Sequence, residues 1–326
     1  MKNIAAVYRQ YGKPAEVVAA ETLEVPALRQ GQVLVKLLRA PVNPSDLGMI
    51  GGSYGMLKQL PAIAGREGVG EVVEAAAGAA LKVGDKVALS SELGTWQQYQ
   101  VADSDALMRV PEGLDLDALA MAFINPPTAL CFLEKFAKLG EGDWIIQNGA
   151  GSALGYFLIQ MCAARGVKTV NMLRNAAAKK AALEKIGADI IVDENEFDAK
   201  KIKTLTDGKI LLGLNQIGGE SVSNMIKAAG NSATIVTIGA MTSDPIRFPT
   251  RFLIFNDLRL RGFWWDKWQR THSKAEVDAV YAKIFGMIKD GTLKAPVDSV
   301  FKIADIQNAL ARAMENSRSG KVMIEF

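Results

Sequence analysis

Short apolar runs alternate with longer segments of helical periodicity through the second and third quarters of the chain. The first run, residues 144–146, is followed by a glycine-rich turn and then by an apolar segment of helical length, residues 154–164. Further runs lie at residues 168–173, 189–192, 210–216, 233–238 and 258–264. Apolar runs of this length are typical of strands buried on both faces, and strands that alternate with helices form parallel sheets. The pattern predicts an α/β fold with a doubly wound parallel sheet.

The glycine-rich turn between the first predicted strand and its helix has the spacing Gly-x-Gly-x-x-x-Gly, at Gly149, Gly151 and Gly155. This is one residue longer than the usual dinucleotide-binding pattern. Glycines let the backbone approach a pyrophosphate closely, and the free N–H groups at a helix start favour its negative charge. A purely structural turn is the alternative, but the strands and helices that follow favour a Rossmann nucleotide domain.

The end of the second predicted strand indicates which nicotinamide cofactor is used. An acidic residue there would bind the ribose 2′-hydroxyl of NAD. Arg174 occupies this region instead, and the next acidic residue is Glu184. A guanidinium can pair with a 2′-phosphate through two hydrogen bonds. An ordinary surface arginine is the alternative, but the absence of the acid favours NADPH.

The first part of the chain, residues 1–122, has short strand-like runs and many turns, and its prolines argue against helices. We expect an all-β domain that begins with a strand at residues 1–7. A long polar loop starts at Asn43-Pro44-Ser45-Asp46 and carries Tyr54 between glycines. Loops of this kind often carry function, although a glycine-flanked tyrosine also occurs as a plain turn residue.

Three segments after residue 118 complete the expected organisation. A helix starts near residue 118, and Pro126 and Pro127 interrupt it beside Asn125. Residues 258–268 hold three of the five tryptophans, which could line an apolar pocket, a dimer seam or simply an edge strand. Helices are expected at residues 275–289 and 303–316, and a final strand, 321–326, rejoins the first domain. The predicted domains are therefore 1–122, 123–267 and 268–326, the last belonging with the first.

Composition excludes several classes of function. The 326 residues carry 38 Lys and Arg against 35 Asp and Glu, a net charge of +3 that does not argue for nucleic acid. There is no apolar run of membrane-spanning length, and no leader precedes the first predicted strand, so we expect a cytoplasmic protein. Cys131, Cys162 and a single histidine, His272, offer neither a zinc ligand set nor a catalytic triad. We expect no metal, and we expect the cofactor to carry the chemistry.

The whole chain resembles the zinc-free medium-chain dehydrogenase/reductases, and in detail their 2-enoyl thioester reductase branch. The Tyr54 loop, Gln147-Asn148 and Arg261-Gly262-Phe263-Trp264 are the motifs most specific to that branch. The full set of matching segments is 42–46, 52–55, 94–96, 125–129, 146–148, 171–174 and 258–264.

The resemblance implies a Rossmann domain inserted in a split GroES-like domain, a homodimer, and NADPH-dependent reduction of trans-2-enoyl thioesters of coenzyme A or acyl carrier protein. It implies that Tyr54 is the proton donor. The implied cofactor contacts are Asn125, Gly151, Ser152, Ala153, Leu154, Arg174, Ile238, Gly239, Ala240, Met241, Phe263, Trp264, Trp265 and Lys321. Two departures are Ala153, where the human-type turn has glycine, and the uncharged Asn175-Ala176, which weakens the preference for NADPH.

Two other functions stay open at the level of the sequence. An NADPH:quinone or enone oxidoreductase could use the same fold, and it would need no dedicated proton donor because quinones collect protons from solvent. A protein that binds NADPH without catalysis is the other alternative. The intact Tyr54 loop and Asn125 argue against it, since binding alone does not need both.

Overall fold

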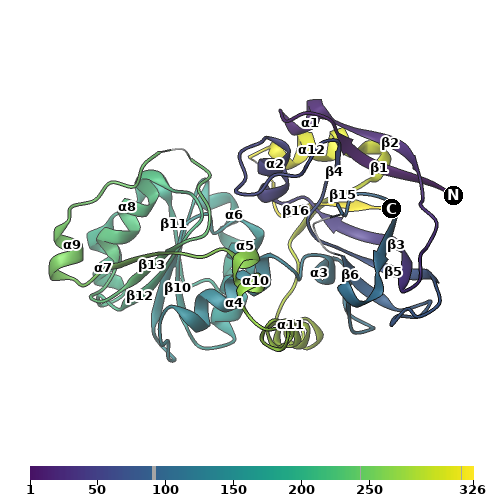
Figure 1. Ribbon diagram of the computed structural model, residues 1–326. Coiled ribbons are helices and arrows are strands. Elements are labelled where there is room, and N and C mark those ends of the chain that lie inside the picture. The colour runs from purple at the N-terminus through teal and green to yellow at the C-terminus, as the bar shows by residue number, and fades with distance from the viewer. Residues whose placement is uncertain (90–92, 243, 317) are drawn as a thin grey trace. The chain divides into compact units, whose positions relative to one another are not determined.

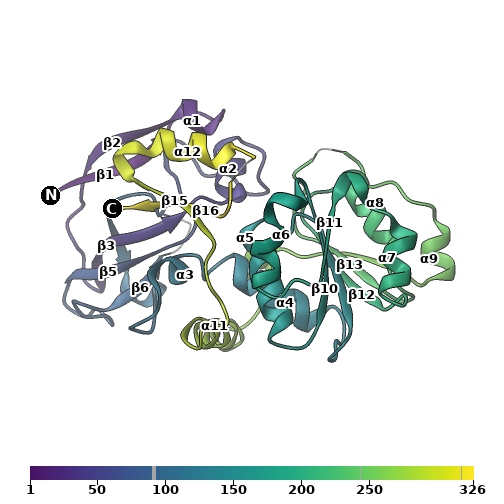
Figure 2. The same cartoon turned by 180° about the vertical axis from the view of Figure 1, so that it is seen from behind.

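The computed structural model describes residues 1–89, 93–242, 244–316 and 318–326. The chain forms two compact units, one of Met1–Phe123 with Ala295–Phe326 and one of Ile124–Lys294 (Figures 1 and 2). In this division the chain returns to the first unit after Lys294, whereas the sequence analysis placed the return after residue 267. Helices α10 (Trp265–Thr271) and α11 (Lys274–Lys289) belong to the second unit.

The second unit contains the predicted doubly wound sheet. Its strand order is β11-β10-β9-β12-β13-β14, and every neighbouring pair is parallel. This order reverses beside β9, as in dinucleotide-binding domains. The strands are β9 (Trp144–Gln147), β10 (Lys168–Leu173), β11 (Ile190–Asp193), β12 (Ile210–Asn215), β13 (Thr234–Thr237) and β14 (Arg259–Gly262). The sequence prediction of six parallel strands is confirmed.

Helices cover both faces of this sheet, because its strands bury apolar side chains on both sides. Helices α5 (Ala153–Ala163) and α6 (Ala176–Lys185) lie on one face (Figure 2), where Ile159 and Leu183 share a core with Leu173. On the other, Ile202 of α7 (Ala199–Leu205) and Val222 of α8 (Gly219–Ala228) pack in a second core. The remaining helical elements described in the unit are α4 (Asn125–Lys135), η2 (Glu194–Glu196), α9 (Arg251–Phe255), α10 and α11.

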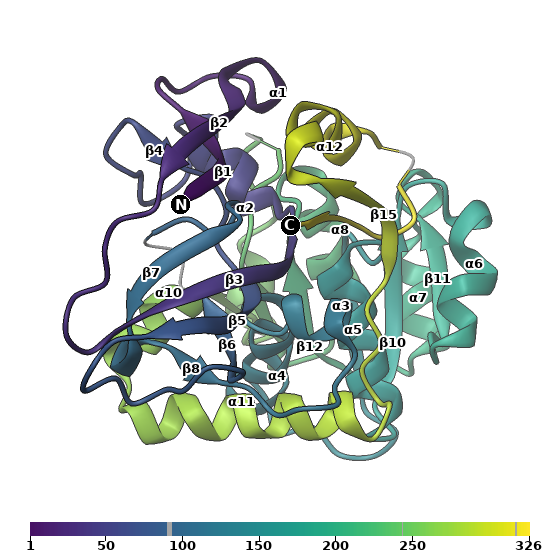
Figure 3. The ribbon, with the colours of Figure 1, turned by 90° about the vertical axis from the view of Figure 1, so that its right-hand side faces the viewer.

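The first unit is rich in strands, and the C-terminal strand completes it. The last strand, β16 (Lys321–Glu325), rejoins the first unit, as the sequence predicted, and the C-terminus lies among the strands of this unit in Figure 3. It pairs antiparallel with β3 (Gln32–Pro41), with Met323 opposite Pro41. The larger sheet has the order β15-β16-β3-β5-β6-β8, with β7 also paired to β3, and the smaller has the order β2-β1-β4. Their other strands are β1 (Lys2–Tyr8), β2 (Val18–Glu24), β4 (Ala62–Ile63), β5 (Gly68–Ala75), β6 (Lys86–Leu89), β7 (Tyr99–Asp103), β8 (Met108–Arg109) and β15 (Val297–Lys302).

The prediction that residues 1–122 are all β is wrong, because helices interrupt the strands. Helix α2 (Pro44–Ile50) begins where the sequence analysis expected a polar loop. Pro44 occupies its first turn, where a missing N–H removes no helical hydrogen bond. The Asp46 carboxylate accepts the backbone N–H of Asn43 at 2.7 Å and so stabilises this helix start. The other helical elements described in this unit are α1 (Pro14–Val17), η1 (Ser104–Ala106), α3 (Leu116–Ala120), η3 (Ile303–Asp305) and α12 (Ile306–Met314).

The expected helix across Asn125 is two helices. Helix α3 ends at Ala120 and α4 starts at Asn125, with Pro126 and Pro127 in the first turn of α4. The prolines therefore begin a helix rather than interrupt one, for the same reason as Pro44. Across the described ranges, no helix combines the length and the hydropathy needed to cross a bilayer.

Candidate active site

Buried side-chain amides tie together the carboxyl ends of the central strands in the second unit. Gln147 Nε2 donates to Asn171 Oδ1 at 2.8 Å, which links β9 to β10. Asn148 Nδ2 donates to Asn215 Oδ1 at 2.9 Å, which links the end of β9 to β12. All four side chains are fully buried. Since hydrogen bonds in a buried network are costly to break, this edge of the sheet is a rigid support for the turn that follows β9.

The glycine turn and the start of α5 form a cradle for a pyrophosphate. Gly149 has a φ of +62°, which a side chain would strain. Ser152 caps α5, because its Oγ accepts the Gly155 N–H at 3.0 Å. The same hydroxyl donates to Gln216 Oε1 at 2.9 Å. A Cβ atom on Gly155 would lie 2.4 Å from the Ala150 carbonyl oxygen, so the helix start is packed directly on the turn.

Four predicted contacts, Gly151, Ser152, Ala153 and Leu154, therefore lie together at the N-terminus of an 11-residue helix. The first amides of a helix have no partner within it, and they favour an anion. The geometry fits the pyrophosphate of a dinucleotide.

Lys179 is a residue near this cradle that the sequence analysis missed. Its ammonium nitrogen, on α6, lies 2.9 Å from the position that a Cβ atom on Gly151 would occupy. A positive charge beside the turn adds to the attraction for phosphate. Lys179 and Lys180 are adjacent in the sequence, where they are indistinguishable from an ordinary solvated helix face.

The end of β10 presents a cation rather than an acid. Arg174 is exposed directly after the strand, and Asn175 turns the chain with a φ of +54°. The nearby acid is Asp193, at the end of β11. Backbone N–H groups of Asn195 and Ala176 donate to this carboxylate and hold its pKa below the usual range. The Asp193 carboxylate thus accepts hydrogen bonds from local backbone groups, while Arg174 places a positive charge at the end of β10, where a 2′-phosphate would bind.

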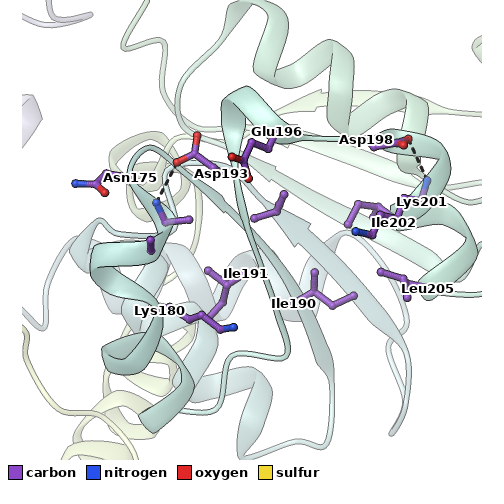
Figure 4. Close-up of a pocket in the computed structure, with 13 residues that line it drawn as sticks. Asn175, Lys180, Ile190, Ile191, Asp193, Glu196, Asp198, Lys201, Ile202 and Leu205 are labelled. Carbon is purple, nitrogen blue, oxygen red and sulfur yellow. Dashed lines mark hydrogen bonds between the residues drawn. The ribbon is translucent and has the colours of Figure 1, made fainter.

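A hollow of about 410 Å³ lies along the edge strand β11, between α6 and α7 (Figure 4). Its apolar side chains include Ile190, Ile191 and Leu205, and Asp193, Glu196 and Asp198 lie along the upper edge of the view. None of the predicted cofactor contacts lines it. Its three carboxylates outnumber the two ammonium groups of Lys180 and Lys201, so the hollow does not favour phosphate, and we do not assign the cofactor to it.

The second cluster of predicted contacts follows β13 and β14. Ile238, Gly239, Ala240 and Met241 form a turn directly after β13, and the Ile238 N–H donates to Asn215 O at 2.9 Å. The turn therefore sits beside the end of β12. Its exposed members, Ala240 and Met241, are accessible to a ligand within this unit.

The predicted aromatic contacts have different environments. Phe263 packs edge-to-face on Phe136, with ring centroids 5.7 Å apart, and Trp264 lies under the Arg270 guanidinium at 5.2 Å. Trp265 is buried and stacks on Trp268 at 5.0 Å. Trp265 thus contributes to the core of the second unit, while Phe263 and Trp264 remain partly exposed. Asn125, also partly exposed, starts α4 in the same unit.

In the first unit, Tyr54 is half-buried a few residues after α2, and Arg66 contacts it in two ways. Arg66 Nη1 donates to the Tyr54 hydroxyl oxygen at 2.9 Å, and its Cζ lies 4.7 Å from the centre of the Tyr54 ring. The sequence analysis identified Tyr54 and missed Arg66. Arg66 gave no signal because it precedes β5 in a Gly-Arg-Glu-Gly segment that has no recognisable motif.

Lys321 lies in a buried network of the same unit. Its ammonium donates to the side-chain oxygen of Asn43 and to Val42 O, the latter at 3.3 Å. Asn43 Nδ2 in turn donates to Glu67 Oε1 at 2.6 Å, and Glu67 Oε2 accepts the Phe123 N–H at 3.0 Å. Burial raises the pKa of Glu67 and lowers that of Lys321, and the attraction between their charges opposes both shifts. Lys321 therefore has a structural role here, and its contact with a cofactor stays a prediction.

The remaining reactive side chains do not form a site. His272 contacts Trp268 O through Nδ1 at 2.8 Å, which is a local contact. Burial raises the pKa of the Cys131 thiol to about 12 and raises that of Cys162 as well, so both are unreactive. Within the described ranges, no group of three or more His, Cys, Asp and Glu side chains is placed to hold a metal ion.

Two family models match the chain. The model "Alcohol dehydrogenase GroES-like domain" matches residues 29–112, and "Zinc-binding dehydrogenase" matches residues 153–283. The mitochondrial enoyl-[acyl-carrier-protein] reductase of Rattus norvegicus is 37% identical over 318 residues, which cover 95% of this chain and 85% of that protein.

Solved structures agree with this relationship. The Etr1p complex with NADP and crotonyl-CoA has a TM-score of 0.92 and 26% identity, and all of both chains is covered. A putative NADPH:quinone reductase from Bacillus thuringiensis, at 23% identity and a TM-score of 0.90, shares the fold over 100% of this chain and 99% of that one. The chain belongs to the medium-chain dehydrogenase/reductase family, in its 2-enoyl thioester reductase branch.

Proposed function

We propose that this protein reduces the 2,3 double bond of trans-2-enoyl thioesters of coenzyme A or acyl carrier protein, with NADPH as reductant and Tyr54 as proton donor. The observation that carries the proposal is the environment of Tyr54. The residue is half-buried, and its hydroxyl oxygen accepts a hydrogen bond from Arg66 at 2.9 Å, an arrangement that a tyrosine in a plain turn does not require. The names of the rat relative and of the Etr1p complex support the same reaction.

The chemistry requires a proton as well as a hydride. When bound, NADPH supplies the hydride that adds to C3 of the enoyl thioester. Negative charge then develops on the thioester oxygen, and C2 must receive a proton. A tyrosine has an ordinary pKa of about 10, so its hydroxyl is protonated near neutral pH and can donate. Tyr54 is the residue to which we assign that proton.

Features of the second unit support NADPH. The helix start at Ser152, the ammonium of Lys179 and the exposed Arg174 together offer one site for a pyrophosphate and one for a 2′-phosphate. Within this proposal Arg174 distinguishes NADPH from NADH. The turn from Ile238 to Met241 and the aromatics Phe263 and Trp264 are assigned to the nicotinamide half.

A quinone or enone reductase is the second candidate, since the putative quinone reductase from Bacillus thuringiensis has the same fold. A quinone needs no fixed proton donor. The hydrogen bond that holds the Tyr54 hydroxyl therefore favours an enoyl thioester as the substrate. The test is the initial rate of NADPH oxidation with crotonyl-CoA, with trans-2-decenoyl-CoA and with a 1,4-quinone at equal concentrations. We expect rapid turnover of a thioester. Turnover of the quinone alone would move the protein to the second candidate, and NADPH binding without any turnover would leave a cofactor-binding protein.

We also propose that the protein is a cytoplasmic homodimer. Strand β14 is the last of its sheet, and Ile254 and Phe255 of α9, just before it, are 70% and 80% exposed. Apolar side chains this exposed beside a strand edge are typical of protein interfaces. A monomer in sedimentation velocity at micromolar concentration would contradict the dimer.

A further inference from the structure

Arg66 is a buried cation in contact with the side chain of Tyr54. It lies between β4 and β5 and is 5% exposed. One nitrogen of the guanidinium, Nη1, donates to the Tyr54 oxygen at 2.9 Å, while its central carbon lies 4.7 Å from the centre of the Tyr54 ring. The first contact fixes the oxygen and the second fixes the plane of the ring. Together they hold Tyr54 more narrowly than either alone.

The charge of Arg66 is retained in this environment. A guanidinium stays protonated in proteins, and burying its charge is costly unless an opposite charge lies nearby. Asp46 of α2 supplies that charge. It is 1% exposed, and although burial raises its pKa to about 6, the charge of Arg66 is the largest effect that opposes this rise. The charge of Asp46 therefore offsets part of the cost of burying the guanidinium charge.

The other charged groups of this cluster come from elements around the same site. Among the residues that the structure describes they include Lys58 of the segment after α2, Glu67 next to Arg66, and Lys321 of β16. Tyr8 of β1 also faces Asp46. Of these groups Arg66 contacts the Tyr54 oxygen, and because a guanidinium stays protonated it favours a negative charge on that oxygen.

We propose that Arg66 is the positioning residue for proton transfer by Tyr54, and this rests on the proposed function. Because Arg66 donates to the Tyr54 oxygen, the hydroxyl proton of Tyr54 is directed away from the guanidinium, and in the proposed reaction this is the proton that C2 receives. During the reaction the O–H bond breaks, the proton forms a bond to C2, and the electron pair stays on the oxygen as tyrosinate. The guanidinium keeps its protons and stabilises that anion, and solvent then returns a proton to Tyr54.

A direct test measures the ionisation of Tyr54 in the protein without substrate. The six tyrosines are labelled with ¹³C at Cζ, and the Tyr54 resonance is assigned by its loss in Tyr54→Phe. We expect its pKa to lie below the ordinary value of about 10. In Arg66→Gln it rises by about one unit or more, whereas in Arg66→Lys, which keeps the charge, it rises less. Equal pKa values in wild type and Arg66→Gln overturn the proposal. If Arg66→Gln does not fold, a wild-type Tyr54 pKa of about 10 or higher overturns the proposal.

Kinetics give a second readout that a purely structural role of Arg66 would not produce. The protonated form of Tyr54 is the active one, so kcat for crotonyl-CoA falls as pH rises through the pKa of Tyr54. In Arg66→Gln we expect this alkaline fall to move to higher pH, with kcat lower by about tenfold or more at neutral pH and the Kd for NADPH unchanged. The titration of Tyr54 needs no substrate. Absence of thioester turnover would therefore refute the proposed function, while an unchanged Tyr54 pKa would refute only the role of Arg66.

Discussion

Gly155 offers the sharpest structural prediction, because a single methyl group tests how the cofactor cradle is built. The Cβ atom of an alanine would lie 2.4 Å from Ala150 O and 2.7 Å from Ala150 C. Ordinary contacts begin at 3.4 Å, so the helix and the turn would have to separate by 3.4 − 2.4 = 1.0 Å. Both atoms belong to the backbone, and no side-chain rotation can relieve the contact.

The expected loss follows from two opposing effects. Replacing glycine by alanine inside a helix usually stabilises it by about 1 kcal/mol. Overpacking a buried position costs about 1–3 kcal/mol, and here the displaced atoms form the turn itself. We therefore expect Gly155→Ala to lower the free energy of unfolding and to raise the Kd for NADPH by about tenfold, which corresponds to about 1.4 kcal/mol.

Gly286 supplies a matched control. It lies inside α11 of the same unit, and an added Cβ atom would meet nothing within 4 Å. Gly286→Ala should stabilise the protein by about 0.5–1 kcal/mol and leave NADPH binding unchanged. The assays are urea unfolding followed by circular dichroism and NADPH titration followed by tryptophan fluorescence. If both variants gain stability and bind NADPH like wild type, the close packing of α5 on the glycine turn does not limit the site.

Two further predictions concern charge. Arg174→Ala should lower kcat/KM with NADPH by about tenfold or more, since a charged hydrogen bond contributes about 1.5–3 kcal/mol, while the value with NADH serves as the internal control and stays within about twofold. Hydrogen bonds from Arg312 hold the pKa of Asp298 down to about 2, below its ordinary value of 3.8. The stability contributed by this carboxylate is therefore present above about pH 4 and is lost as the pH falls toward 2, so Asp298→Asn should destabilise the protein at pH 7 and have much less effect at pH 2 in urea unfolding.

The parallel sheet could be predicted from the sequence because its signal is local. Each apolar run is short, is followed by a helical segment and is buried on both faces, so pattern and structure coincide. The strand predicted at residues 168–173 has the bounds of β10, and the helix predicted at 154–164 is α5 shifted by one residue. The glycine turn could be predicted for the same reason.

The sequence did not predict features that depend on the position of a residue within a helix or on a contact between separate segments of the chain. Pro44 was interpreted as a helix breaker, although a proline in the first turn begins a helix. Arg66 follows Tyr54 by 12 residues, and the two side chains meet only because the chain folds back before β5. No periodicity or spacing in the sequence contains that information.

The most direct measurement of the central claim is the turnover of crotonyl-CoA by wild type and by Tyr54→Phe at saturating NADPH. Tyr99→Phe, which removes a hydroxyl from β7 in the same unit, is the control. General acid catalysis contributes about 10²–10⁴-fold, so kcat should fall by about a hundredfold or more in Tyr54→Phe alone, with the Kd for NADPH unchanged. A kcat for Tyr54→Phe equal to that of wild type would contradict the assignment of Tyr54 as the proton donor.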